Sequence, residues 1–170
     1  MKKLLFASLV LLAIVGCSPN REKELRKIQQ HEVTLVAAEN ALDEQFCTRM
    51  VELYTRFSDH FPDDSLAPVF LFRAADVCVS SLANNERAVS LLDTVISLYP
   101  GFEDIAGCWF LKGLAYENAE QFDSARVAYT TFVDNFPNHP LAHDTRQSLQ
   151  YLGLSPAETL EAIHSQNTAL

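Results

Sequence analysis

The chain has 170 residues, of which 48% are hydrophobic and 21% charged, with only 5 glycines and 7 prolines. This composition excludes collagen-like and intrinsically disordered classes and favours one folded domain. The formal net charge of −9 leaves no basic surface for a phosphate backbone, so we expect no nucleic-acid partner.

The first 16 residues have the pattern of a targeting segment. Two lysines precede an apolar run over residues 4–15, which is too short to span a bilayer of about 30 Å as a helix. The run ends in Ile14-Val15-Gly16-Cys17, which resembles the lipobox of bacterial lipoproteins. The resemblance implies cleavage before Cys17, attachment of diacylglycerol to its thiol and acylation of the new amino terminus. An ordinary signal peptide with an incidental cysteine is the alternative.

Charge is unevenly distributed along the rest of the chain. Without residues 1–16 the net charge is −11; residues 17–27 hold four basic and two acidic side chains, whereas residues 28–170 hold 7 basic and 20 acidic ones. Two interpretations of the basic segment remain open. In one, the segment lies against anionic lipid headgroups, which attract each basic side chain by about 1 kcal/mol. In the other, it is a solvated tether.

Aromatic-proline pairs then recur at a nearly constant period. Phe61-Pro62, Tyr99-Pro100 and Phe136-Pro137 are separated by 38 and 37 residues, and each ends a segment with apolar residues at helical spacing. Short polar turns at 83–86 and 120–123 divide two of the units into two helices each. A period in this range predicts an array of helical hairpins, which must stack to bury their apolar faces.

The predicted organisation follows from these signals. Residues 1–16 form the signal peptide, 17–27 the anchor and tether, and 28–164 the repeat domain. We expect units at about 28–62, 66–100 and 104–137, with capping helices over 141–164 and a frayed tail at 165–170. The first helix falls somewhere within 24–40. Ser155-Pro156-Ala157-Glu158 has the pattern of a capping box with proline in the first turn.

The second and third units resemble the signature of a tetratricopeptide repeat, in which small, bulky, aromatic and proline residues occupy set positions. They are Ala75, Ala88, Pro100, Trp109, Gly113, Tyr116, Ala125, Tyr129 and Pro137. The resemblance spans roughly residues 45–152 and implies an all-α fold, with helical hairpins stacked as a short right-handed solenoid. It is strongest for small bacterial outer-membrane lipoproteins, similar to the barrel-assembly lipoprotein component and the repeat domain of the cell-division coordinator.

Candidates for chemistry are few. Cys47 and Cys78 fall on helices expected to be neighbours, so a disulfide is one interpretation; the favoured one is that they and Cys108 are buried thiols. His139 and His143 have the spacing of two ligands on one helix, but Pro140 between them places His139 ahead of the helix. The chain carries no hydrolase, zinc-protease or phosphate-loop motif. We therefore expect no enzyme, no metal site and no cofactor.

A partner-binding groove is the principal site hypothesis. The first helix of each hairpin lines the concave surface, and residues at helical spacing on the second and third units face one way. They are Phe72, Asp76, Val79, Ser80, Phe110, Leu114, Glu117 and Asn118. We expect an aromatic floor with an acidic rim, suited to peptides bearing basic and apolar side chains. The alternative is that the phenylalanines and Leu114 belong to the core.

The resemblance implies a scaffold that binds a protein or peptide and has no chemistry of its own. We predict a monomeric lipoprotein, attached through Cys17 to a bacterial outer membrane, facing the periplasm and acting in envelope assembly. Ser18, in place of Asp, agrees with the sorting rule for outer-membrane lipoproteins. Two alternatives are a cell-surface accessory or substrate-binding lipoprotein of an uptake or degradation system, and a self-associating structural protein.

Overall fold

The structure is a computed structural model that describes residues 19–37 and 43–168. This part of the chain forms eight α-helices and no strand. The helices are α1 (Arg21–Ala37), α2 (Glu44–His60), α3 (Ala67–Ser80), α4 (Asn85–Leu98), α5 (Ile105–Asn118), α6 (Phe122–Asn135), α7 (Ala142–Tyr151) and α8 (Pro156–Thr168). Within the same ranges, no helix combines the length and apolar character needed to cross a bilayer. The predicted signal peptide and Cys17 lie outside the described residues.

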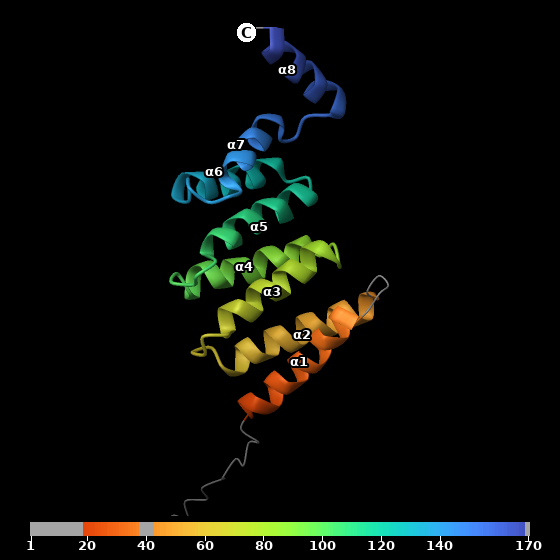
Figure 1. Ribbon diagram of the computed structural model, residues 1–170, viewed down its shortest axis with the longest axis vertical. Coiled ribbons are helices and arrows are strands. Elements are labelled where there is room, and N and C mark those ends of the chain that lie inside the picture. The colour runs from red at the N-terminus through yellow and green to blue at the C-terminus, as the bar shows by residue number, and fades with distance from the viewer. Residues whose placement is uncertain (1–18, 38–42, 169–170) are drawn as a thin grey trace, which may run out of the picture.

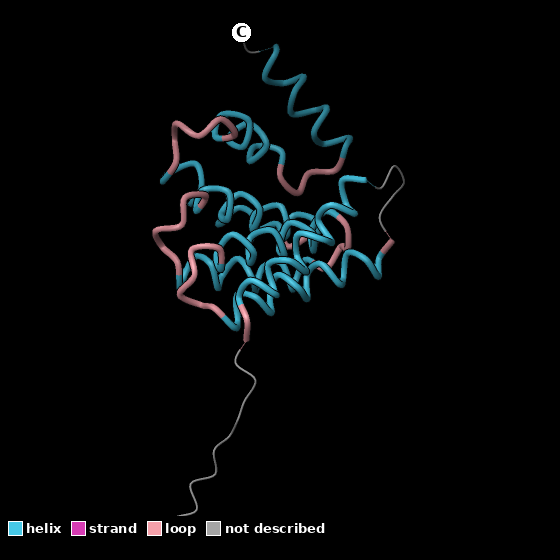
Figure 2. Tube along the Cα trace, turned by 60° about the horizontal axis from the view of Figure 1, so that its bottom comes forward, coloured by secondary structure: helices cyan, strands magenta, loops and turns pink. Residues whose placement is uncertain are grey.

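The helices stack in chain order as antiparallel hairpins. Each helix from α1 to α6 packs against the next, and α3 also contacts α5 (Figure 1). The tube view shows the loops gathered at the two edges of the stack, with the helices crossing between them (Figure 2). The predicted all-α fold of stacked helical hairpins is therefore confirmed.

The three aromatic-proline turns share one backbone conformation. The aromatic residue has φ −133° and ψ 61° at Phe61, −127° and 57° at Tyr99, and −127° and 56° at Phe136. In each turn the N–H three residues later donates to the carbonyl of the aromatic residue, at 2.9–3.0 Å. A second hydrogen bond follows in each turn: the N–H six residues after the aromatic residue donates to the carbonyl three residues after it. The next helix starts there. The sequence period thus corresponds to a repeated backbone geometry.

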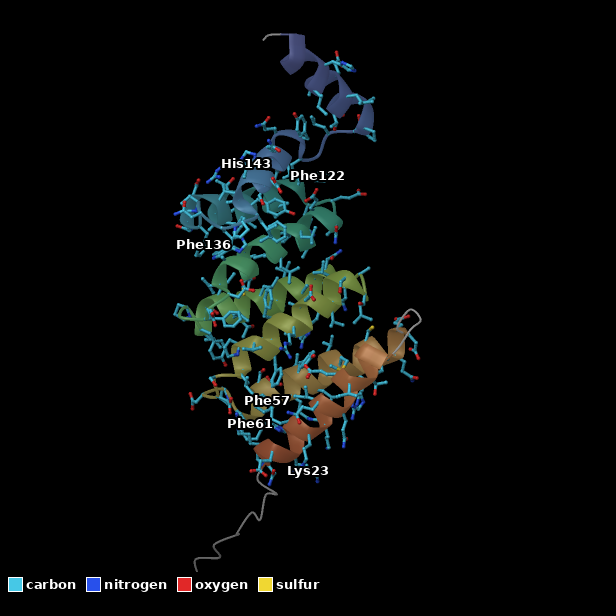
Figure 3. All side chains as sticks on the ribbon, viewed as in Figure 1. Lys23, Phe57, Phe61, Phe122, Phe136 and His143 are labelled. Atoms are coloured by element: carbon cyan, nitrogen blue, oxygen red, sulfur yellow. The ribbon has the colours of Figure 1, made fainter. Side chains whose placement is uncertain are left out.

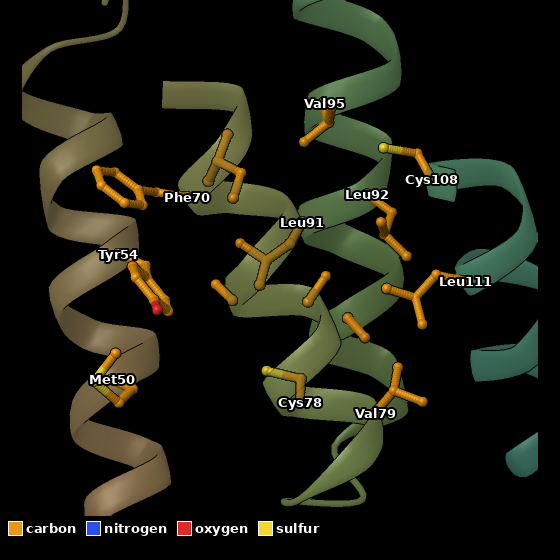
Figure 4. Close-up of a cluster of buried hydrophobic side chains, with 14 of the residues drawn as sticks. Met50, Tyr54, Phe70, Cys78, Val79, Leu91, Leu92, Val95, Cys108 and Leu111 are labelled. Carbon is orange, nitrogen blue, oxygen red and sulfur yellow. The ribbon is translucent and has the colours of Figure 1, made fainter. Parts of the chain in front are cut away.

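The first core cluster joins α1 to α5. Figure 4 shows side chains from several helices meeting in it, among them Tyr54, Phe70, Leu92 and Leu111. Phe57 is fully buried there, and its ring centroid lies 5.0 Å from that of Phe61 and 4.9 Å from that of Phe70. Smaller clusters around Phe132 and Tyr129 continue the core into α6 and α7.

Most signature positions of the repeat lie at the packed faces of the hairpins. Ala75, Ala88 and Ala125 are fully buried. A Cβ atom at Gly113 would lie 2.4 Å from Cδ1 of Tyr129, so this position holds glycine because the tyrosine ring occupies the space. Trp109 and Tyr116 are half-buried, whereas Pro100 and Pro137 are exposed in the turns.

Cys47, Cys78 and Cys108 are free thiols, and each is at most 2% exposed. Burial raises the pKa of the Cys78 thiol, and it raises that of Cys108 to about 12. The thiols therefore pack as small apolar groups, and the Cys47–Cys78 bridge does not form in this structure.

Helix α1 begins at Arg21, inside the segment predicted as anchor and tether. Its main apolar anchor is Ile28, at 1% exposure, and polar contacts supply much of the remaining attachment. These contacts are His60 Nδ1 to Glu24 Oε1 (2.7 Å), Arg73 Nη1 to Glu32 Oε1 (2.6 Å), Tyr54 Oη to Glu32 Oε1 (2.8 Å) and the Arg21–Asp64 pair. The helix begins earlier than the sequence predicts, because the charged residues at its start form these contacts within the array.

The predicted capping box is confirmed at the start of α8. The N–H of Ser155 donates to Glu158 Oε2 at 2.8 Å, and the N–H of Glu158 donates to Ser155 Oγ at 3.3 Å. The helix continues to Thr168, four residues past its expected end at His164, so residues 165–168 are helical where a frayed tail was expected. It projects from the array, with Leu160 and Ile163 exposed (Figure 1).

Candidate partner-binding groove

The first half of the predicted groove is carried by α3. Phe72 is half-buried, and its ring centroid lies 6.0 Å from that of Phe102 in the following turn. Asp76, one turn further along, is exposed. Ser80 is also exposed and donates from Oγ to the backbone carbonyl of Asp76 at 2.7 Å. Val79 is 9% exposed and packs into the first core cluster. This face therefore presents the aromatic ring of Phe72 and the exposed carboxylate of Asp76.

The second half is carried by α5, where more of the predicted residues point into the protein. The Phe110 ring lies 5.8 Å from Tyr129 and 5.6 Å from Phe132, centroid to centroid. Leu114 packs against the first core cluster. Glu117 is half-buried, and its Oε2 accepts a hydrogen bond from Tyr129 Oη at 2.7 Å. Only Asn118, the last residue of α5, is exposed.

The electrostatics of this face are set by where its two cations lie. Arg73, the one cation of α3, reaches Glu32 of α1 at 2.6 Å. Lys112, the one cation of α5, lies 2.5 Å from Asp93 of α4 and over the Trp109 ring. Asp76 forms no ion pair with the described residues, and desolvation raises its pKa. The face is therefore acidic, with its cations engaged elsewhere.

A hollow that the sequence did not reveal lies at one edge of the array. It has a volume of about 580 Å³ and opens between the first and second aromatic-proline turns. Its lining includes Val69 of α3 and Phe102, and Phe102 contacts Phe72 of the groove face. The acidic residues that follow the first and second aromatic-proline pairs were the available signal. Nothing in a linear sequence shows, however, that two turns 38 residues apart enclose a space.

The two histidines considered as ligands are placed differently. His139 precedes α7, as expected, and its Nδ1 accepts the N–H of Leu141 at 3.2 Å. His143 lies on α7, where its Nε2 is 3.3 Å from Nε2 of Gln147 (Figure 3). Across the described ranges, no three His, Cys, Asp or Glu side chains gather in a way that could hold a metal ion.

Comparison with known families identifies one unit directly. Residues 108–139 match a family model described as tetratricopeptide repeat. The match covers most of α5, all of α6 and the turn that follows, which is the unit containing Gly113 and Tyr129. No curated protein and no solved structure matches the chain. The match supports a tetratricopeptide-repeat protein, a type that generally mediates contacts between proteins and is typically not catalytic.

Proposed function

We propose that this protein is a membrane-anchored scaffold that binds a protein or peptide partner in bacterial envelope assembly. The observation that carries the proposal is the tetratricopeptide match over residues 108–139, set within an array of similar hairpins. An array of stacked hairpins presents a long continuous surface, which suits binding an extended segment of another protein. The acidic groove face favours partners with basic and apolar side chains.

The lipid anchor in this proposal rests on the sequence Ile14-Val15-Gly16-Cys17. Cells grown with labelled palmitate should incorporate the label into the native chain, and a Cys17→Ala variant should carry none. Cys47→Ala serves as the control, because Cys47 is buried and its loss leaves the acceptor thiol in place. Equal labelling of the native and Cys17→Ala chains would refute the anchor. The proposed position is the periplasmic face of the outer membrane, and protease added outside intact cells should leave the chain uncut.

The groove is tested by crosslinking in cells from its exposed positions. A photoreactive residue at Ser80 or at Asn118 should crosslink to the same envelope protein, whereas one at the exposed Ser90 on α4 should not. Adding Asp76→Lys should reduce the crosslinked product at least fivefold, because it reverses the open charge on the acidic face. Asp76 is the better choice for charge reversal, since Glu117 accepts the Tyr129 hydroxyl and its replacement would disturb packing.

Asp134→Lys on α6 is the matched control, because it makes the same charge change at another exposed position. This variant should leave the crosslinked product unchanged. If Asp76→Lys and Asp134→Lys have equal effects, or if Ser90 gives the same product as Ser80, the groove is not the binding surface.

A further inference from the structure

Two equivalent turns build the edge hollow described above. Residues 62–65, with Pro68 and Val69, form one side and residues 98–103 the other. Each turn is fixed by its own backbone hydrogen bonds. Tyr99 joins them, because its hydroxyl donates to the carbonyl of Pro62 at 2.9 Å. The volume of about 580 Å³ falls in the range of sites that bind small ligands or anchor side chains.

The lining of the hollow combines apolar side chains with polar ones and is open to solvent. Leu98, the last residue of α4, is 66% exposed although it is a large aliphatic side chain. Val69 and Phe102 are half-buried beside it. Three prolines, Pro62, Pro68 and Pro100, complete the apolar lining. An apolar side chain from another molecule could therefore be buried here without displacing any part of the array.

Carboxylates surround this apolar lining. Asp63 and Glu103 line the hollow and are exposed. Burial raises the pKa of Tyr99, and the nearby negative charges of Asp63 and Asp59 raise it further. None of these three carboxylates forms an ion pair with any residue that the structure describes. The rim thus carries uncompensated negative charge beside an apolar surface.

The protein itself shows how a guanidinium binds at this rim. Arg21 of α1 contacts the Asp64 carboxylate through two nitrogens, Nε and Nη2, the latter 3.2 Å from Oδ1. The hydrogen bond holds the pKa of Asp64 below its usual value. Two-nitrogen contacts of this kind are the strong, oriented form of an arginine–carboxylate pair. Asp64 is thereby satisfied within the chain, whereas the neighbouring carboxylates are available to a partner.

We propose that this hollow binds a segment of a partner protein in which an arginine lies next to a bulky apolar side chain. The apolar side chain enters between Leu98, Val69 and Phe102, and the guanidinium contacts Asp63 and Glu103. The inference goes beyond the groove, since it concerns a second surface whose residues differ from those of the groove face. An anionic ligand would be repelled by the rim, and a bare cation would leave the apolar lining unused.

The test selects ligands without assuming a sequence. The purified full chain, held in detergent, is exposed to a displayed library of random eight-residue peptides. Retained peptides should be enriched in arginine next to leucine, isoleucine, methionine or phenylalanine. A retained peptide is then synthesised with a fluorescein label and its affinity measured by anisotropy. Retained peptides without basic residues, or failure to retain any peptide, would overturn the proposal.

Variants locate the bound peptide. Asp63→Asn with Glu103→Gln should weaken binding at least tenfold, and Leu98→Ser at least fivefold. Asp134→Asn with Glu120→Gln removes two exposed carboxylates elsewhere and should stay within twofold of the native affinity. Asp76→Lys separates the two surfaces and should also stay within twofold. Loss of binding in Asp76→Lys but not in the hollow variants would overturn this proposal while leaving the proposed function standing.

Discussion

Replacing Phe57 by alanine is expected to lower the free energy of unfolding by about 3–5 kcal/mol, the range for removing a buried aromatic ring. The ring is fully buried and lies against both Phe61 and Phe70, so neighbouring side chains on two sides would lose contacts and a cavity would remain. Domains of this size are stable by about 5–15 kcal/mol. Urea denaturation followed by circular dichroism at 222 nm would measure the loss.

Phe122→Ala is the matched control for this change, because it removes the same ring from a position that is 37% exposed (Figure 3). Its cost should be about 1–2 kcal/mol, since more than a third of the side chain already contacts water. If the two variants unfold at the same urea concentration, Phe57 does not have the packing role assigned to it.

Replacing Gly113 by alanine is expected to lower the free energy of unfolding by a net of about 2 kcal/mol, even though alanine is the better helix former. Alanine gains about 1 kcal/mol in helix propensity, whereas forcing an extra methyl group into a filled space costs about 3 kcal/mol at the upper end. The added carbon would lie 2.4 Å from Cδ1 of Tyr129. Tyr129 cannot readily move, because its hydroxyl donates a hydrogen bond to Glu117 and its ring packs near Phe110.

Gly101→Ala provides the comparison, because a Cβ atom there would meet nothing within 4 Å. That variant should be as stable as the native chain, by the same urea titration. A Gly113→Ala chain that is equally stable would mean that α5 and α6 can separate without cost. The corresponding position in the preceding unit is Ala75, and the residue aligned with Tyr129 is Leu92; both are buried in the first core cluster.

The turns were predictable because their signal is local. Each aromatic-proline pair imposes its own backbone geometry, and the three copies adopt it within a few degrees. The capping box at Ser155 is of the same kind, since all its hydrogen bonds fall within four residues. Fold class and most helix positions follow from such short-range rules, together with the spacing of apolar residues.

The groove could not be predicted to the same depth, because helical spacing reports which residues share a face and does not report what that face contacts. Phe110 and Asn118 were assigned to one surface, yet Phe110 packs near Tyr129 and Phe132 whereas Asn118 is exposed. The ion pairs of Arg73 and Lys112 connect residues 41 and 19 positions apart. Pairings over such distances depend on how helices are stacked, which the sequence pattern leaves open.

The stacking of the helices in chain order also bears on how the protein folds. Each helix from α1 to α6 packs against its successor, and α3 against α5, so these packed helices are close in sequence. Forming such contacts closes only short loops, and proteins with local contacts fold faster than those that must bring distant segments together. In linear arrays of this kind, folding can start at any hairpin and spread to its neighbours. The early hairpins could therefore assemble while later parts of the chain are still unfolded.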